Sequence, residues 1–185
     1  LIYEWVKLKT GKMSSREGNV IEANWLIDEV QKKIAAGFKC DESTAEILAV
    51  ASAKYSFLKN STQTIIAFDI DESVSIEGNS APYLIYTYVR CQSVIKKSGT
   101  NNITMKQSNN KTINVDELNV LRLINQFPET VRQAAIKYSP NLIANYLYEL
   151  AQKYNYFYQK NKILESDEKT KQFRLMLTQV VGKII

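Results

Sequence analysis

The stretch PNLIANYLYELAQKYNYFYQKNKIL, residues 140–164, decides the fold class. Its apolar side chains recur every three or four residues, a spacing that places them along one side of an α-helix. Pro140 favours a helix start, because its fixed backbone angle suits the first turn and its missing N–H is not needed there. Such a long one-sided helix needs other helices to cover it, so the sequence predicts a mainly α protein built around an antiparallel helical bundle. The apolar stripe consists of Ile143, Leu147, Leu150, Tyr154 and Phe157.

The same spacing predicts helices on both sides of this stretch. Short runs of β-branched and aromatic residues instead predict strands near the N-terminus, at residues 2–9 and 64–70. Ser80 and Pro82 are suited to the first turn of a helix, and Pro128 predicts that one helix ends and another begins there. The predicted helices cover residues 25–37, 41–58, 82–97, 116–127, 128–138, 140–164 and 167–185.

This order of elements predicts two parts. Residues 1–76 form a small α/β segment, and residues 77–185 form the helical domain. Within the second part, residues 98–114 are polar and low in complexity, so we expect them to form a mobile surface loop.

Composition excludes several classes of protein. The 185 residues contain no histidine, which rules out Ser-His-Asp triads, Cys-His pairs and the usual zinc sites. The two cysteines, Cys40 and Cys91, cannot make a disulfide framework and are expected to be small buried apolar residues in a reducing compartment. No stretch is apolar enough for a membrane span. The net charge of +5 suits a polyanion, and residues 83–115 carry five cations and no carboxylate.

The segment TGKMSSREGN, residues 10–19, has the composition of a phosphate-binding loop. Lys12 supplies a mobile charge and Arg16 a planar fork, while Ser14 and Ser15 supply neutral donors between flanking glycines. These groups suit the negative charge of a polyphosphate at a phosphoryl or adenylyl centre. Taken as composition alone, a solvated basic turn remains the alternative.

The loop resembles the "KMSKS" signature of class I aminoacyl-tRNA synthetases, and most closely that of the arginyl branch. The resemblance continues in EGNSAPYLIYTYVR, residues 77–90, and in the segments around 127–135 and 140–158, in the same order over nearly the whole chain. It implies that Lys12, Ser14, Ser15 and Arg16 hold the phosphates of ATP during amino-acid activation. Arg16 stands where the commonest form of the loop has lysine, so the geometry of that contact differs.

The helix predicted from Pro82 carries two rings and a guanidinium on one face, because Tyr83, Tyr86 and Arg90 stand at i, i+3 and i+7. Such a stripe suits unstacked nucleobases, although packing of the tyrosines into a helical core is the alternative. The resemblance implies that these residues contact the anticodon of tRNA. It implies the same for Tyr158, and Lys96 continues the stripe toward the nucleic-acid backbone.

Taken together, the resemblance implies a C-terminal fragment of an arginyl-tRNA synthetase that contains the signature loop and the anticodon-binding domain. The whole enzyme would be cytoplasmic, would use ATP with Mg²⁺ to activate arginine, and would attach it to arginine tRNA, with no membrane or DNA partner. The "HIGH" signature is absent, so we expect the isolated chain to be inactive and to carry no bound cofactor or metal. A non-catalytic helical RNA-binding or interaction module is the alternative. Lys106 and Lys111 are expected to lie in a solvated loop without function.

Overall fold

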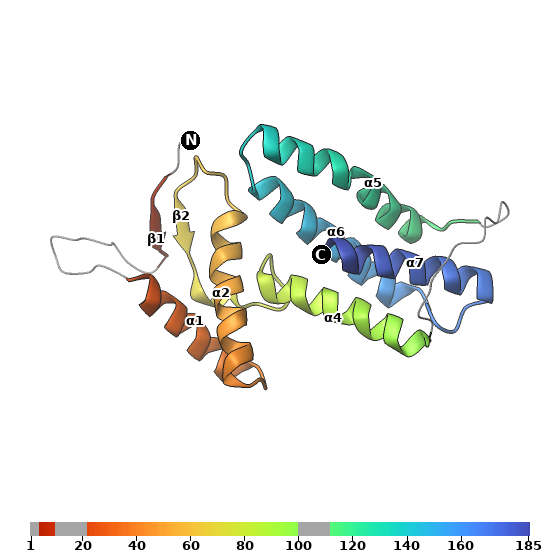
Figure 1. The fold of residues 1–185 in the computed structure, drawn as a ribbon, viewed down its shortest axis with the longest axis horizontal. Helices are drawn as coiled ribbons and strands as arrows, with labels where there is room; N and C mark the ends of the chain where they lie inside the picture. Colours follow the sequence, from red (N-terminus) through yellow and green to blue (C-terminus); the bar gives the residue numbers. More distant parts are fainter. Residues whose placement is uncertain (1–3, 10–21, 100–111) are drawn as a thin grey trace. The chain divides into compact units, whose positions relative to one another are not determined.

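The computed structural model describes residues 4–9, 22–99 and 112–185 of the chain. Seven helices and two short strands make up the secondary structure of these residues, which confirms the mainly α prediction (Figure 1). The chain divides into two compact units. The first comprises Leu1–Tyr83 and Gln133–Asn145, and the second comprises Leu84–Arg132 and Tyr146–Ile185.

Two short parallel strands belong to the first unit. Strand β1 (Val6–Leu8) pairs with strand β2 (Ile66–Phe68), and Leu8 lies opposite Phe68. Parallel strands require a long crossover between them, which the two helices α1 and α2 provide. Both strands fall inside the runs predicted from sequence, but they are shorter than those runs. Just beyond β1, Lys9 Nζ lies 2.9 Å from a carboxylate oxygen of Asp69.

Helices α1 (Ala23–Gly37) and α2 (Glu42–Leu58) complete the core of the first unit. The carboxylate of Asp41 caps α2 by accepting a hydrogen bond from the backbone N–H of Thr44 at 2.7 Å. The helical spacing of apolar residues in the predicted helix 25–37 includes Trp25, but Trp25 is 44% exposed. The buried residues of this core are Leu26, Val30, Ile34, Ala45, Ala49, Phe68 and Val74.

The first unit also contains residues distant in sequence. A short helix, α3 (Ile70–Ser73), follows β2 and leads to the segment that carries Asn79. The Tyr55 hydroxyl on α2 donates to Asn79 Oδ1 at 2.6 Å and to the carbonyl of Ala144 at 3.0 Å. Tyr55 therefore joins the segment that carries Asn79 to the first turn of helix α6 (Asn141–Lys160).

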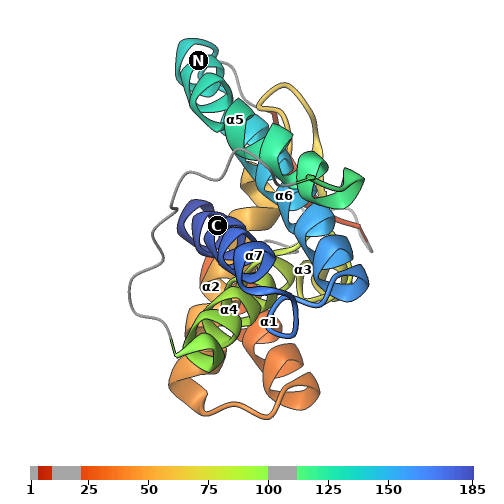
Figure 2. The ribbon, with the colours of Figure 1, turned by 90° about the vertical axis from the view of Figure 1, so that its right-hand side faces the viewer.

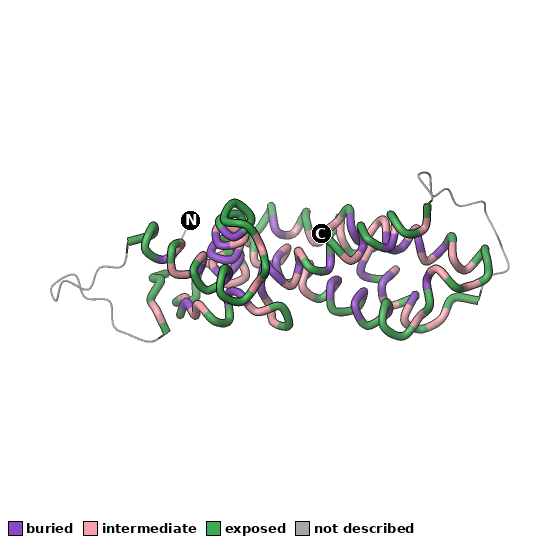
Figure 3. The backbone as a smooth tube through the Cα atoms, turned by 90° about the horizontal axis from the view of Figure 1, so that it is seen from below, coloured by how far each residue is buried: buried purple, intermediate pink, exposed green. Residues whose placement is uncertain are grey.

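Four helices pack around the core of the second unit. They are α4 (Ala81–Ser98), α5 (Val115–Ile136), α6 (Asn141–Lys160) and α7 (Glu168–Ile184). Figures 1 and 2 both show α5 beside α6 and α7 beside α4. Figure 3 shows buried positions recurring along each helix, as one-sided burial requires. The core contains Cys91, Val94, Val120, Leu123, Tyr146, Leu150, Tyr154, Phe157, Ile163, Leu175 and Val181.

Two predicted helix boundaries in this part are wrong. Residues 115–136 form one helix with Pro128 in its interior, where separate helices were predicted on either side of the proline. An interior proline removes one backbone hydrogen bond, but the apolar residues on both sides of Pro128 continue the helical spacing and Phe127 packs against Tyr146. Helix α6 ends at Lys160 and not near residue 164, since Asn161 turns its side-chain amide back to the carbonyl of Phe157.

Candidate nucleic-acid interface

The start of α4 fixes the position of the residues predicted to contact RNA. The Ser80 hydroxyl oxygen accepts a hydrogen bond from the backbone N–H of Tyr83 at 3.3 Å, so Ser80 caps the helix as predicted. Tyr83 lies half-buried in the first turn. Tyr86 follows one turn later, and its side chain is 48% exposed. Of the two tyrosines predicted to contact RNA from this helix, Tyr86 is the one that is exposed to solvent.

Arg90 lies against two aromatic rings that come from different helices. Its guanidinium carbon is 4.6 Å from the centroid of the Tyr86 ring on α4 and 4.6 Å from the centroid of the Tyr158 ring on α6. A guanidinium over the face of a ring is attracted by the negative charge density of that face. We call Tyr86, Arg90 and Tyr158 the aromatic–arginine cluster. Tyr158 is 38% exposed, so both rings of the cluster are accessible to solvent.

Hydrogen bonds fix the orientation of the guanidinium. Arg90 Nη1 donates to Asn155 Oδ1 at 2.5 Å, and Arg90 Nη2 donates to the hydroxyl of Tyr86. Asn155 Nδ2 in turn donates to the hydroxyl oxygen of Thr87 at 2.8 Å. Asn155 and Thr87 are both buried. The guanidinium is thus held by one exposed phenol and one buried amide.

Sequence reasoning missed Asn155 and Thr87. A signal for them was present, because each polar residue interrupts an apolar face. Asn155 stands between the core residues Tyr154 and Phe157, and Thr87 stands one turn before Arg90. A buried amide or hydroxyl needs a hydrogen-bond partner, so polar residues at such positions predict a specific contact between helices.

Lys96 lies in the last turn of α4 and is exposed. A cation at this end of a helix is stabilised by the partial negative charge of the terminal carbonyl groups. Its ammonium is accessible to a phosphate, and the geometry does not join Lys96 to the aromatic–arginine cluster. The structure therefore brings Tyr86, Arg90 and Tyr158 together and leaves Lys96 at the helix end.

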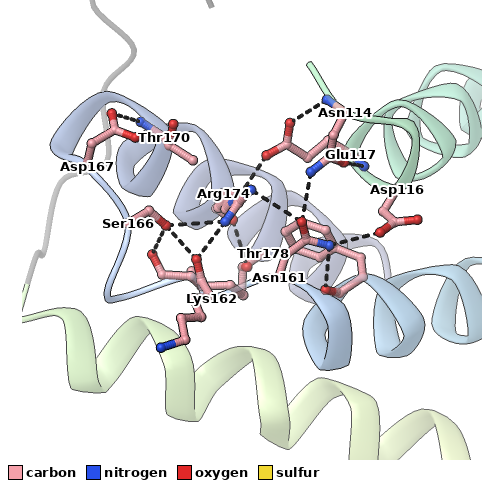
Figure 4. Close-up of polar contacts among 12 residues, drawn as sticks. Asn114, Asp116, Glu117, Asn161, Lys162, Ser166, Asp167, Thr170, Arg174 and Thr178 are labelled. Carbon is pink, nitrogen blue, oxygen red and sulfur yellow. Dashed lines mark hydrogen bonds and ion pairs between the residues drawn. The ribbon is translucent and has the colours of Figure 1, made fainter. Parts of the chain in front are cut away.

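A second polar network lies in the same unit, where α5 begins and where α6 connects to α7 (Figure 4). Arg174 Nε donates to a carboxylate oxygen of Glu117 at 2.7 Å, and Arg174 Nη1 donates to the carbonyl of Lys162 at 2.7 Å. The other carboxylate oxygen of Glu117 accepts from the backbone N–H of Asn114 at 3.0 Å. Glu117 is almost fully buried, so this network is structural and joins α5 to α7.

The residues predicted to hold ATP phosphates, Lys12, Ser14, Ser15 and Arg16, lie outside the described residues. Lys106 and Lys111 also lie outside them. Their predicted roles therefore stay predictions.

Several buried groups of the second unit belong to the core and not to the interface. The Tyr146 hydroxyl donates to the carbonyl of Leu123 at 2.8 Å, and burial raises the pKa of Tyr146 to about 12. Burial also raises the pKa of Tyr154, whose hydroxyl donates to Thr178 at 3.3 Å. These neutral phenols fill the core, as predicted for Tyr154. Burial raises the pKa of the Cys91 thiol to about 11, while Cys40 is only half-buried.

Neither a metal-binding cluster nor a membrane-spanning helix occurs among the residues that the structure describes. No group of three or more acidic or thiol side chains is arranged to hold a metal ion. Within residues 4–9, 22–99 and 112–185, none of the helices combines the length and the apolar character that a membrane span requires.

Residues 84–185 match the family model described as "DALR anticodon binding domain". This match covers more than half of the chain and contains Tyr86, Arg90, Lys96 and Tyr158. It begins just after Tyr83, inside α4.

Relatives and solved structures agree with this match. The chain is 36% identical over 192 residues to the arginine–tRNA ligase of Fusobacterium nucleatum, covering 97% of this chain and 33% of the relative. It is also 36% identical over 197 residues to that of Parabacteroides distasonis, covering 99% of this chain and 33% of the relative. The chain thus spans about a third of the length of the curated relatives it matches.

The fold is similar to that of the arginyl-tRNA synthetase of Thermus thermophilus, with a TM-score of 0.85 at 23% identity over 98% of this chain and 32% of that one. A putative arginyl-tRNA synthetase from Campylobacter jejuni gives a TM-score of 0.63 at 22% identity over 77% of this chain and 32% of that one. The chain belongs to the DALR anticodon-binding domain family.

Proposed function

We propose that this chain binds the anticodon of arginine tRNA as part of an enzyme that activates arginine with ATP and attaches it to that tRNA. One observation carries the proposal. Two partly exposed tyrosine rings and a guanidinium converge from α4 and α6 inside the segment that matches the anticodon-binding family. Rings and guanidinium groups are the side chains that bind unstacked RNA bases.

In this proposal the tyrosine rings stack on anticodon bases, and Arg90 donates hydrogen bonds to them. A guanidinium has five N–H groups. Two of these N–H groups donate to Asn155 and Tyr86, and the others remain as donors for an acceptor atom of the RNA. Every arginine codon has G in the middle position, so every arginine anticodon has C there. Cytosine offers a ring nitrogen and a carbonyl as acceptors, and Arg90 has the donors that match them.

Tyr83 and Lys96 extend the surface along α4. Tyr83 precedes Tyr86 by one helical turn, where a further base can stack. The exposed Lys96 ammonium would neutralise a phosphate, a contact without base specificity that weakens as salt rises.

In the proposal, the loop at residues 10–19 contributes to ATP binding. Lys12, Ser14, Ser15 and Arg16 would bind the phosphates of ATP, which enters the whole enzyme with Mg²⁺. We assign no metal ligand to this chain. We place the boundary between the catalytic part and the anticodon-binding part at residues 76 and 77, and we place the enzyme in the cytoplasm, where translation consumes its product.

A corollary concerns the chain on its own. The loop supplies only one side of an ATP site, and the sequence lacks the "HIGH" signature that binds adenosine in class I enzymes. The 185-residue chain should therefore bind tRNA without charging it. Turnover by the isolated chain in an aminoacylation assay would refute this corollary.

The test of the proposal is filter binding with two tRNAs that are identical except at the middle anticodon base. The first is arginine tRNA, and the second carries another base at the middle anticodon position. We expect the wild-type protein at its natural length to bind the first more tightly, and we expect the double variant Tyr83→Ala/Arg90→Ala to lose that preference. Equal binding of the two tRNAs by the wild-type protein would contradict direct reading of the anticodon.

A further inference from the structure

Arg90 depends on a residue that cannot itself contact RNA. Asn155 is only 6% exposed, yet its Oδ1 accepts a hydrogen bond from Arg90 Nη1 at 2.5 Å. The side chain of Asn155 therefore lies beneath the aromatic–arginine cluster and faces the guanidinium from α6. A free arginine side chain has several rotatable bonds and would sample many orientations.

The orientation of the Asn155 amide is fixed in turn by Thr87. Asn155 Nδ2 donates to Thr87 Oγ1 at 2.8 Å, and Thr87 is fully buried. Because Nδ2 faces Thr87, Oδ1, the acceptor of the amide, faces Arg90. A rotated amide would present its two donors to the guanidinium, which has no acceptor.

Helical spacing places Thr87 and Asn155 next to residues of the aromatic–arginine cluster on the same two helices. Thr87 and Arg90 are three residues apart on α4, and Asn155 and Tyr158 are three residues apart on α6. Residues at this spacing are neighbours on a helix surface. One buried polar contact between α4 and α6 thus lies directly under the guanidinium that contacts the Tyr86 and Tyr158 rings.

We propose that Asn155 is a positioning residue for tRNA recognition, which holds Arg90 against the two rings before RNA arrives. This inference rests on the proposed function. Binding by an ordered side chain avoids the entropy cost of ordering it in the complex. Asn155 therefore raises affinity for arginine tRNA through Arg90, without a contact of its own.

Two variants of Asn155 separate this role from general packing. Asn155→Leu keeps the branched shape of the side chain and removes both hydrogen bonds. Asn155→Asp keeps the oxygen acceptor that Arg90 binds and removes only the hydrogen bond to Thr87. The aspartate is thus the conservative replacement, and it preserves the arrangement even if the leucine variant folds poorly.

The experiment measures aminoacylation kinetics of the protein at its natural length with Asn155→Leu, Asn155→Asp, Arg90→Ala and the double variant Asn155→Leu/Arg90→Ala. We expect Asn155→Leu to raise the KM for arginine tRNA by about tenfold, the scale of losing a hydrogen bond to a charged group. The KM for ATP stays unchanged. Asn155→Asp stays within about threefold of wild type, and the double variant is no weaker than the weaker single variant.

Three results would overturn the inference and leave the proposed function intact. They are losses that add in the double variant, an aspartate variant as weak as the leucine variant, and a leucine variant that binds like wild type while Arg90→Ala binds weakly. If Arg90→Ala itself has no effect on the KM for tRNA, the proposed function fails and the inference fails with it.

Discussion

The guanidinium carbon of Arg90 lies 4.6 Å from the centroid of the Tyr158 ring, although the two residues belong to different helices, α4 and α6. A surface built in this way depends on how the two helices pack and on each side chain. Cys91, the neighbour of Arg90, and Phe157, the neighbour of Tyr158, are both buried in the core that these helices share. The core of the bundle therefore determines where the exposed groups meet.

Removing the exposed ring of α4 should weaken RNA binding without unfolding the chain. We expect Tyr86→Ala to weaken binding of arginine tRNA by about 1–3 kcal/mol, the value of stacking one base on an aromatic side chain. Tyr86→Phe should lose less, because it keeps the ring and removes only the hydroxyl that accepts from Arg90. Filter binding at constant salt measures both effects.

Tyr156→Ala is the matched control for this prediction. Tyr156 is also an exposed tyrosine of the second unit, 53% exposed on α6, and it contacts Lys160 and not Arg90. The substitution Tyr156→Ala should leave the affinity for arginine tRNA unchanged. A loss of affinity equal to that of Tyr86→Ala would show that the aromatic–arginine cluster has no special role.

Breaking the buried ion pair between Glu117 and Arg174 should destabilise the second unit. Arg174→Met leaves the carboxylate of Glu117 buried without its charged partner, so we expect a loss of about 3–5 kcal/mol in the free energy of unfolding. The double variant Glu117→Leu/Arg174→Met should recover most of this loss, because it removes both charges. Urea unfolding followed by circular dichroism measures both values. An unchanged unfolding midpoint for Arg174→Met would disprove the prediction.

The N-terminal cap of α7 should make stability depend on pH in the acid range. Hydrogen bonds from the side chain and backbone of Thr170 hold the pKa of the Asp167 carboxyl below its ordinary value. Because the folded state has the lower pKa, the stabilisation is present above the pKa of the unfolded chain, about 3.9, and is lost as the pH falls through the folded pKa. We expect Asp167→Ala to lower the Tm at pH 7, and the difference from wild type to shrink below about pH 4.

Asp167→Asn provides the comparison, since it keeps an oxygen acceptor at the cap and does not titrate. Its Tm should exceed that of Asp167→Ala by a similar amount at every pH. If wild type keeps its full advantage over Asp167→Ala at pH 2, the carboxylate is not the source of the stabilisation.

The two cysteines should differ in reactivity. The thiolate is the reactive form, and burial raises the pKa of Cys91 to about 11, whereas Cys40 is half-buried. With a thiol reagent at pH 8, mass spectrometry should find rapid labelling of Cys40 in the folded chain and labelling of Cys91 only after unfolding. A Cys40→Ser variant should lose the rapid phase. Equal rates at the two cysteines in native protein would contradict the burial of Cys91.

Much of the fold could be predicted from the sequence, because helix starts depend on local chemistry. Ser80 caps α4 where its position predicts, and the helices predicted to begin at residues 41 and 167 begin one residue later, with Asp41 and Asp167 as their caps. The joining of two predicted helices across Pro128 could not be predicted, since it depends on packing on both sides of the proline. The exposure of Trp25 likewise depends on which neighbours cover α1.

The candidate interface could be predicted only in part. The i, i+3, i+7 spacing identified Tyr83, Tyr86 and Arg90, because it depends on one helix alone. The contact of Arg90 with Asn155 joins two helices that are distant in sequence, and hydrophobic periodicity carries no information about which polar residues meet. The family resemblance identified Tyr158, but not the side chain that holds Arg90 in place.

The most direct test of the central claim is fluorescence of an anticodon stem-loop that carries a fluorescent cytosine analogue at the middle anticodon position. If that base stacks on the aromatic–arginine cluster, the wild-type protein should quench the fluorescence on binding. Tyr86→Leu and Tyr158→Leu should each reduce the quenching at saturating protein. Quenching of the same size in wild type and in both variants would contradict the account.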